Sequence, residues 1–418
     1  MTRPHVLVAG LLLVAGCQRS SEPTNVQPSR GRVLSLNRRP LSGSLIRMTG
    51  CADQVTACDG SFDTSCAATP YDLAATHGTT GIVYQGLTRP DPVATIPVVV
   101  SSDGASRIIG TVLGRTDDRE AGVSITTTAM SSKVSEPAFD GFYSSYVLWL
   151  DTSPWASIRA IEWTGTSSGP TAFTAYGEVR VPLLAAVEPT GSPTLQPIAN
   201  GTLSVSIEAT HPEMAEGQLR AEWREGEVTH LADFWPGSSR ASIPTPDVPG
   251  VAFTVVFVDA DYEQSSSGYT SGWRRGVPAT AAPDPITLPT AAAFTTPRSD
   301  DLVDLSTDFT YTAVPGAVYL LSLESGVTSD PRYYVVTSDT TSRIPDLSWA
   351  GVPAPRWSGA TYYTASVSAL GPFTSVDDVA AGPIPVEPDE WAWQQPFAIA
   401  LPTVDGFATR HRMTVRVR

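Results

Sequence analysis

The chain has 418 residues, 41% of them hydrophobic, and carries a formal net charge of −15. This length is sufficient for two to four globular domains, each with a buried core. The acidic charge argues against a nucleic-acid partner, because binding to phosphates requires a basic surface.

The N-terminus combines a short apolar segment with a single cysteine. Residues 6–16 are apolar, but a permanent membrane-spanning helix needs about 20 such residues. Arg3 provides the positive start of a secretory signal, and Val14-Ala15-Gly16-Cys17 resembles the lipobox of bacterial lipoproteins. The resemblance implies that residues 1–16 are a signal peptide and that the Cys17 thiol carries lipid.

The expected lipid determines where the protein resides. Two or more acyl chains, palmitate among them, make an anchor effectively permanent. Gln18 stands where many inner-membrane lipoproteins have aspartate, so the resemblance implies the outer membrane of a Gram-negative host. Residues 17–30 are polar and contain prolines, which predicts a disordered tether. We therefore expect an anchored protein of the bacterial cell envelope, either periplasmic or exposed at the surface.

Strand patterns dominate the rest of the chain. TLSVSIEA (202–209) and QLRAEWRE (218–225) alternate apolar and polar residues, as half-buried strands do. The runs FTVVFV (253–258) and VYLLSL (318–323) are typical of strands buried on both faces. Amphipathic helices are scarce, and prolines and glycines separate the runs. These patterns predict an all-β protein of tandem β-sandwiches.

The first block after the tether resembles a known sandwich family. It contains a Gly-Arg-Val opening strand, then RPLSGSLIRMTG (39–50), TACDGSF (56–62) and PYDL (70–73). This order resembles the carboxypeptidase regulatory-like, or transthyretin-like, β-sandwich over residues 31–97. The chain departs from that family in its inserted cysteines and in having Pro70 where glycine is usual.

A second resemblance covers about residues 288–383. FTYTAVPGAVYLLSLES (309–325) and TYYTASVSALG (361–371) are similar to strands of the fibronectin type III sandwich, one of the immunoglobulin-like folds. Proline-rich segments at 185–201 and 278–297 mark further boundaries. We expect β-sandwiches at 31–97 and 98–187, a fibronectin-like sandwich at 188–285, and a last one at 286–418 with a C-terminal strand extension.

Three cysteines remain beyond Cys17, and a secreted context favours a disulfide among them. A two-residue turn at Asp59-Gly60 pairs residues whose numbers sum to about 119, which places Cys51 near Cys66. We predict the bond Cys51–Cys66, with Cys51–Cys58 as the alternative. A zinc site is disfavoured because the spacings lack a C-x2-C clip.

No catalytic motif is found in the sequence. Serine-nucleophile, zinc-protease and nucleotide-binding patterns are missing, and the histidines after the signal lie far apart, at His77, His211, His230 and His411. Asp53, Asp59 and Asp63 could together bind calcium, although Asp59 is already explained by its turn. We therefore expect no enzyme activity, no cofactor and no metal.

Aromatic residues provide the candidate ligand contacts. The segment 261–276 mixes Trp and Tyr with serines and glycines, as protein and sugar-binding surfaces do. Within it we predict that Tyr262, Tyr269 and Trp273 contact a protein or glycan ligand. Segment 388–397 is similar, although Trp391 and Trp393 would face the same side of a strand and pack a domain end.

These observations favour a non-catalytic, lipid-anchored envelope protein whose tandem sandwiches act as a scaffold, spacer, or adhesion or binding module. The alternative is a carbohydrate-binding or enzyme-accessory lipoprotein, and a hydrolase comes third. We expect an elongated monomer that contacts the membrane through its N-terminal lipid.

Overall fold

The computed structural model describes residues 29–36, 39–98, 104–127, 131–135, 141–149, 155–166, 169–183, 187–209, 215–223, 228–234, 239–259, 268–325, 327, 330–356, 362–381 and 405–417. Within these ranges the chain forms 29 β-strands, one short α-helix and a 3-10 helix. The predicted all-β class is confirmed. The expected signal peptide and most of the expected tether lie outside the described residues.

The first unit comprises two facing sheets. The smaller sheet has the order β4-β1-β7, in which β1 (Arg30–Ser35) pairs antiparallel with β4 (Ser61–Asp63) and parallel with β7 (Val93–Ile96). The facing strands are β2 (Leu45–Met48), β3 (Gln54–Val55), β5 (Tyr71–His77) and β6 (Thr80–Leu87). Val33, Ile46, Leu73 and Tyr84 are buried between the sheets.

The second unit packs a two-stranded sheet against a five-stranded one. The pair is β8 (Gly104–Thr111) with β11 (Phe142–Trp149). The larger sheet has the order β10-β9-β12-β13-β14, formed by β9 (Glu120–Thr126), β10 (Ser131–Ser135), β12 (Trp155–Thr166), β13 (Gly169–Pro182) and β14 (Gln196–Pro197). Ile108, Tyr143 and Ile158 lie in its core.

The third unit combines the sheet β18-β15-β21 with four antiparallel strands. Its strands are β15 (Ala199–Glu208), β16 (Ala215–Glu222), β17 (Val228–Phe234), β18 (Arg240–Asp247), β19 (Ala252–Asp259), β20 (Gly268–Val277) and β21 (Ile286–Thr287). Leu203, Val205 and Ile207 are buried, as their alternation predicts. The same core takes Trp163 and Phe173 from the second unit, so these two units are packed together.

The last unit contains the remaining strands. They are β22 (Phe294–Thr296), β23 (Leu302–Val303), β24 (Phe309–Tyr311), β25 (Val318–Ser325), β26 (Arg332–Thr337), β27 (Thr341–Ser342), β28 (Tyr363–Gly371) and β29 (Gly406–Val417). The 3-10 helix η2 (Ser348–Ala350) and helix α1 (Val376–Val379) follow β27 and β28 respectively.

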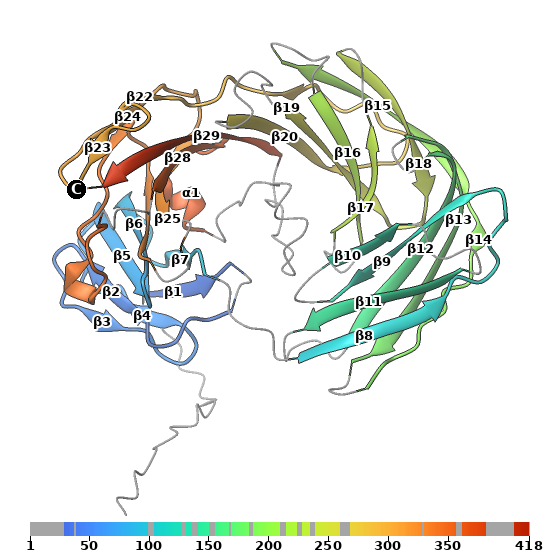
Figure 1. Cartoon of the computed structure of the whole chain (residues 1–418), viewed down its shortest axis with the longest axis horizontal. Helices are drawn as coiled ribbons and strands as arrows, with labels where there is room; N and C mark the ends of the chain where they lie inside the picture. The colour runs from blue at the N-terminus through green and yellow to red at the C-terminus, as the bar shows by residue number, and fades with distance from the viewer. Residues whose placement is uncertain are drawn as a thin grey trace, which may run out of the picture.

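One sheet runs through three of the four units. Its order is β17-β16-β19-β20-β29-β28-β25-β26-β6-β5-β2-β3, with β23 pairing beside β29. The chain therefore curves back, so that the first and last units lie side by side and an arch leads from them to the second and third units (Figure 1). This arrangement corrects the expectation of an elongated series of sandwiches, because β26 pairs in parallel with β6 across the chain.

The C-terminal strand β29 joins the third unit to the last. It pairs antiparallel with β28 from Tyr363 to Gly371 and with β20 from Gly268 to Trp273. Its start is fixed at Asp405, whose carboxylate accepts hydrogen bonds from the Arg275 N–H at 2.7 Å and Arg274 Nη1 at 2.8 Å. Buried and exposed residues alternate at the end of this strand, with Val415 buried and Thr414 exposed.

Helix α1 closes the core of the first unit. Val376 and Val379 are buried in that core. Asp377 Oδ1 accepts hydrogen bonds from the backbone N–H groups of Thr88 at 2.9 Å and Arg89 at 3.0 Å. The last unit therefore supplies both apolar and polar contacts that the first unit needs, and the two are not independent sandwiches.

Candidate functional site

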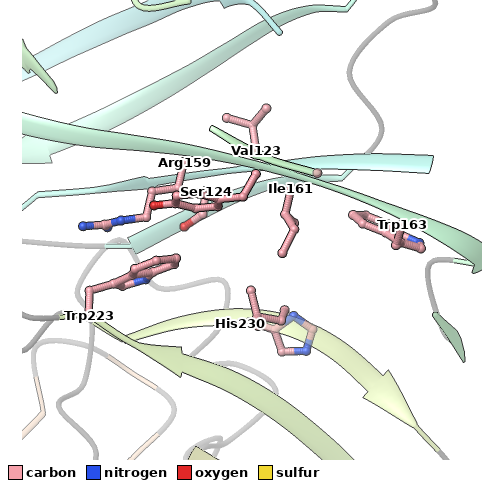
Figure 2. Close-up of a pocket in the computed structure, with 10 residues that line it drawn as sticks. Val123, Ser124, Arg159, Ile161, Trp163, Trp223 and His230 are labelled. Atoms are coloured by element: carbon pink, nitrogen blue, oxygen red, sulfur yellow. The ribbon is translucent and has the colours of Figure 1, made fainter. Parts of the chain in front are cut away.

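A partly enclosed hollow lies where the second and third units meet. It includes about 370 Å³ of space free of protein atoms, part of it open to solvent. Strands β9, β12 and β13 form one wall, and β17 and the residue after β16 form the other (Figure 2). The lining residues are Gly122, Val123, Ser124, Arg159, Ile161, Trp163, Tyr176, Trp223, His230 and Leu231. We call this hollow the junction pocket.

A buried cation organises one side of the junction pocket. The Arg159 side chain is only 3% exposed, and its Nη2 atom lies 3.2 Å from Glu178 Oε1. Its guanidinium carbon lies 4.3 Å from the ring centroid of Trp223, and Figure 2 shows the two side chains next to each other. The Trp223 ring also stacks on Tyr176 at 5.4 Å. A desolvated cation–π contact of this kind contributes about 2 kcal/mol, so these side chains stabilise the contact between the two units.

The opposite side of the pocket contains a second polar cluster. His230 Nε2 lies 2.7 Å from Asp233 Oδ1. Arg220, the cross-strand neighbour of His230, is buried and donates from Nη2 to Gln218 Oε1 at 2.8 Å. Burial lowers the pKa of Arg220 to about 9, and the charge of Asp233 partly opposes that shift. The cluster satisfies buried charge within the third unit.

Ser124 is the serine that lines the junction pocket. Its Oγ atom is buried in the pocket wall and has no hydrogen-bond partner among the described residues. Nucleophilic catalysis requires a base within hydrogen-bond reach of the hydroxyl, and the described residues place none beside Ser124.

Arg159 was not predicted as a site residue, although its position in the sequence carries a signal. Arg159 and Glu162 interrupt the apolar pattern of β12, a strand buried on both faces. Glu162 is held by Thr116 N–H at 2.7 Å, Thr174 Oγ1 at 2.7 Å and Arg119 Nη1 at 3.0 Å. Charges inside such a strand indicate partners supplied by neighbouring elements.

The ligand contacts predicted in segment 261–276 are corrected for Trp273. This side chain is 4% exposed and belongs to the core shared by the first, third and last units. Strand β29 pairs beside it, so the ring cannot meet a ligand. Tyr262 and the side chain of Tyr269 lie outside the described residues, as do Trp391 and Trp393.

The predicted bond between Cys51 and Cys66 is confirmed, with a Cα–Cα distance of 5.6 Å. Cys58 lies exposed beside the turn, and its thiol is not free. Cys17 lies outside the described residues, so its lipidation stays a prediction.

The aspartates suggested for calcium bind separate partners. Asp53 pairs with Arg47 at 2.7 Å, Asp59 accepts from Ser61 N–H at 3.0 Å, and Asp63 accepts from Ser65 N–H at 2.8 Å. These local bonds contradict a shared calcium site. No group of three metal-ligating side chains occurs among the described residues.

The predicted histidines are also separate. His77 Nδ1 lies 3.1 Å from Ser44 Oγ, and His411 packs edge-on against Phe294. Burial lowers the pKa of His411. His211 lies outside the described residues.

In the part of the chain that the structure describes, no helix has the length and apolar character needed to span a membrane.

Comparisons with known proteins give only distant similarities. No protein-family model and no curated protein matches the chain. A candidate adhesin from Bacteroides ovatus aligns at 9% identity with a TM-score of 0.17, covering 38% of this chain and 73% of that one. The shaft pilin SpaA from Lactobacillus rhamnosus GG aligns at 8% identity and a TM-score of 0.15, covering 44% and 97%. A streptococcal ancillary pilin aligns at 9% identity with a TM-score of 0.17, covering 65% of this chain and 93% of that one. These scores are too low to assign a function.

Proposed function

We propose that this chain is a non-catalytic lipoprotein of the bacterial cell envelope, in which β-sandwich units form a rigid curved scaffold for a binding surface. The observation that carries this proposal is the continuous sheet from β17 to β3. Units that share a sheet and cores cannot swing freely, because relative motion would break backbone pairing. The packed junction pocket supports the same role for the second unit.

The location rests on the sequence. The lipobox ending at Cys17 supports attachment to the outer membrane, and the tether of residues 17–30 would separate the scaffold from the lipid. The scaffold would then present its surface as a monomer. The alternative is a carbohydrate-binding or accessory lipoprotein. One specific feature favours it, an open groove between the turn closed by the Cys51–Cys66 disulfide and the η2 segment.

Replacing the lipidated cysteine tests the proposed anchor. Cys17→Ser removes the thiol that receives the lipid, so we expect the unprocessed precursor to accumulate without incorporating an alkyne analogue of palmitate. Labelling in cells followed by gel fluorescence measures this directly. Ser21→Ala, which lies outside the lipobox and leaves every cysteine in place, is the matched control and should label like the wild type. Labelling of Cys17→Ser at the wild-type level would disprove lipidation at this site.

A further inference from the structure

An open groove separates the disulfide-bonded turn of the first unit from the η2 segment of the last. It includes about 780 Å³ of space free of protein atoms, part of it open to solvent. The first unit contributes Arg47, Met48, Thr49, Gly50, Cys51, Asp72, Ala74 and Val83, and the last unit contributes Pro345, Asp346, Leu347 and Trp349. We call it the composite groove, because neither unit forms it alone.

The composite groove has an apolar floor and a polar rim. Ala74, Pro345 and Trp349 are partly exposed and present apolar surface to the groove, whereas Asp72 and Asp346 on the rim are exposed. Met48, Val83 and Leu347 are buried beneath them. Trp349 is partly buried and packs against the core of the last unit. A ligand lying in this groove would therefore meet apolar surface along one side and hydrogen-bonding groups along its edges.

Arg47 presents unused donors to this groove. Its Nε and Nη2 atoms donate to Asp53 Oδ1 at 2.8 Å and Oδ2 at 2.7 Å. The guanidinium carbon lies 4.2 Å from the centroid of the Trp349 ring. This stack and the bidentate pair fix the guanidinium plane. Within the described residues, Nη1 donates no hydrogen bond, so its N–H groups are available to a ligand.

Asp72 adds an unused acceptor on the same rim. Its Oδ1 atom accepts the Gly86 N–H at 2.9 Å. Oδ2 accepts no hydrogen bond from the described residues. Asp346 lies on the opposite side, where its Oδ1 atom accepts the Ser348 N–H at 2.9 Å at the start of η2. The groove thus offers donors and acceptors together.

The walls of the groove are held in place before any ligand arrives. The bond Cys51–Cys66 closes the turn that forms one wall. Thr49 N–H donates to the Asp72 carbonyl at 3.1 Å, and Asp72 N–H donates to Thr49 Oγ1 at 3.2 Å. Such preorganisation reduces the entropy lost on binding.

The charges of the groove select among ligand classes. Asp53 neutralises Arg47, which leaves the carboxylates of Asp72 and Asp346 as the net charge of the rim. These two carboxylates would repel an acidic ligand. A sugar ring matches the remaining features, since its C–H face packs on apolar surface while each hydroxyl both donates and accepts.

We infer that the composite groove binds an uncharged oligosaccharide, with the ring faces over the Arg47–Trp349 stack and hydroxyls bonded to Arg47 Nη1 and Asp72 Oδ2. This inference rests on the binding role in the proposed function but is independent of the lipid at Cys17. The inferred sugar site therefore differs from the predicted contact in segment 261–276. It is formed by residues of the first and last units.

The test uses the full chain in a detergent without a sugar headgroup. Titration calorimetry measures binding of the hexamers of N-acetylglucosamine and of glucose, with the galacturonic acid hexamer as the acidic comparison. We expect one of the neutral hexamers to bind and the acidic one not to bind. Trp349→Ala should weaken binding about tenfold. Asp72→Asn replaces a charge-assisted hydrogen bond by a neutral one and should weaken binding about threefold or more. Trp155→Ala, an exposed tryptophan of the second unit, is the matched control and should bind normally.

Asp72→Asn decides the test if Trp349→Ala unfolds, because asparagine retains the size of the side chain and an acceptor for Gly86. No binding of either neutral hexamer at about 1 mM, binding unaffected by Asp72→Asn, or preference for the acidic hexamer would overturn the inference. None of these outcomes affects the palmitate labelling measured for Cys17→Ser. Failure of the sugar-binding inference is therefore distinguishable from failure of the proposed lipid anchor.

Discussion

Deletion of residues 406–418 is expected to abolish cooperative folding of the third and last units. These residues form β29, which lies between β20 and β28 in the long sheet and also pairs with β23. Ala408, Thr409, Val415 and Val417 are buried along it. Burial of each large apolar side chain contributes about 1.5–3 kcal/mol, and the three strands β20, β28 and β23 would lose their backbone pairing with β29 as well.

Urea unfolding followed by near-ultraviolet circular dichroism measures this effect. The truncated chain should lack the cooperative transition of the wild type. Two point variants that keep β29 in the chain test whether its buried side chains are what stabilise the fold. Val415→Asp places a charge in the core and should destabilise strongly, whereas Thr414→Asp, at the adjacent exposed position, should be nearly neutral. A wild-type transition in the truncated chain would show that β29 does not join the units.

The excised first unit, residues 29–98, is expected to remain unfolded. Its core in the full chain includes residues from the third and last units, namely Val256, Trp273, Val318, Tyr334, Val336, Leu370, Val376, Val379, Ala380 and Ala408. Losing five or more large contacts at about 1.5–3 kcal/mol each removes as much as the whole stability of a typical domain, about 5–15 kcal/mol.

Amide hydrogen exchange of the excised fragment checks this expectation. Exchange at the rate of an unstructured peptide is predicted for β5 and β6. The control is the same segment within the full chain, where β5 and β6 should be protected from exchange. Strong protection of these strands in the isolated fragment would show that the first unit is an autonomous sandwich, as its resemblance to the transthyretin-like family implies.

Local features of the fold were predictable from the sequence. Alternation predicted which face of β15 is buried, since successive side chains of a strand point to opposite faces. The Asp59-Gly60 turn predicted the bond between Cys51 and Cys66 because both cysteines flank it at similar distances. In each case the interacting residues are close in sequence.

Trp273 illustrates why other features were not predictable. Its neighbours include glycines and serines, a composition typical of exposed loops. In the structure, a side chain at Gly272 would come within 3.0 Å of Ile286, Leu288 and the Thr287 carbonyl. The glycine is therefore needed for close packing of β20, not for a flexible loop. Composition alone does not distinguish these two requirements.

Contacts between distant parts of the chain could not be predicted from the sequence either. The composite groove joins Arg47 to Trp349, and the junction pocket joins Arg159 to Trp223. Periodicity indicates which face of a strand is buried but not which strand lies beside it. The parallel pairing of β26 with β6 has no local signal, so the arch and both hollows emerge only from the structure.

Disulfide trapping between the first and last units tests the central claim, that one sheet unites the two ends of the chain. Thr80 and Arg332 are register partners in the parallel pairing of β6 with β26, and neighbouring strands place Cα atoms within disulfide range. Thr80→Cys combined with Arg332→Cys should form an intramolecular bond, detected by peptide mapping, without loss of stability. Thr80→Cys combined with Val187→Cys, in the second unit, is the control and should remain unlinked. Failure of the first pair to link in the folded chain, or equal linking of both pairs, would contradict the shared sheet.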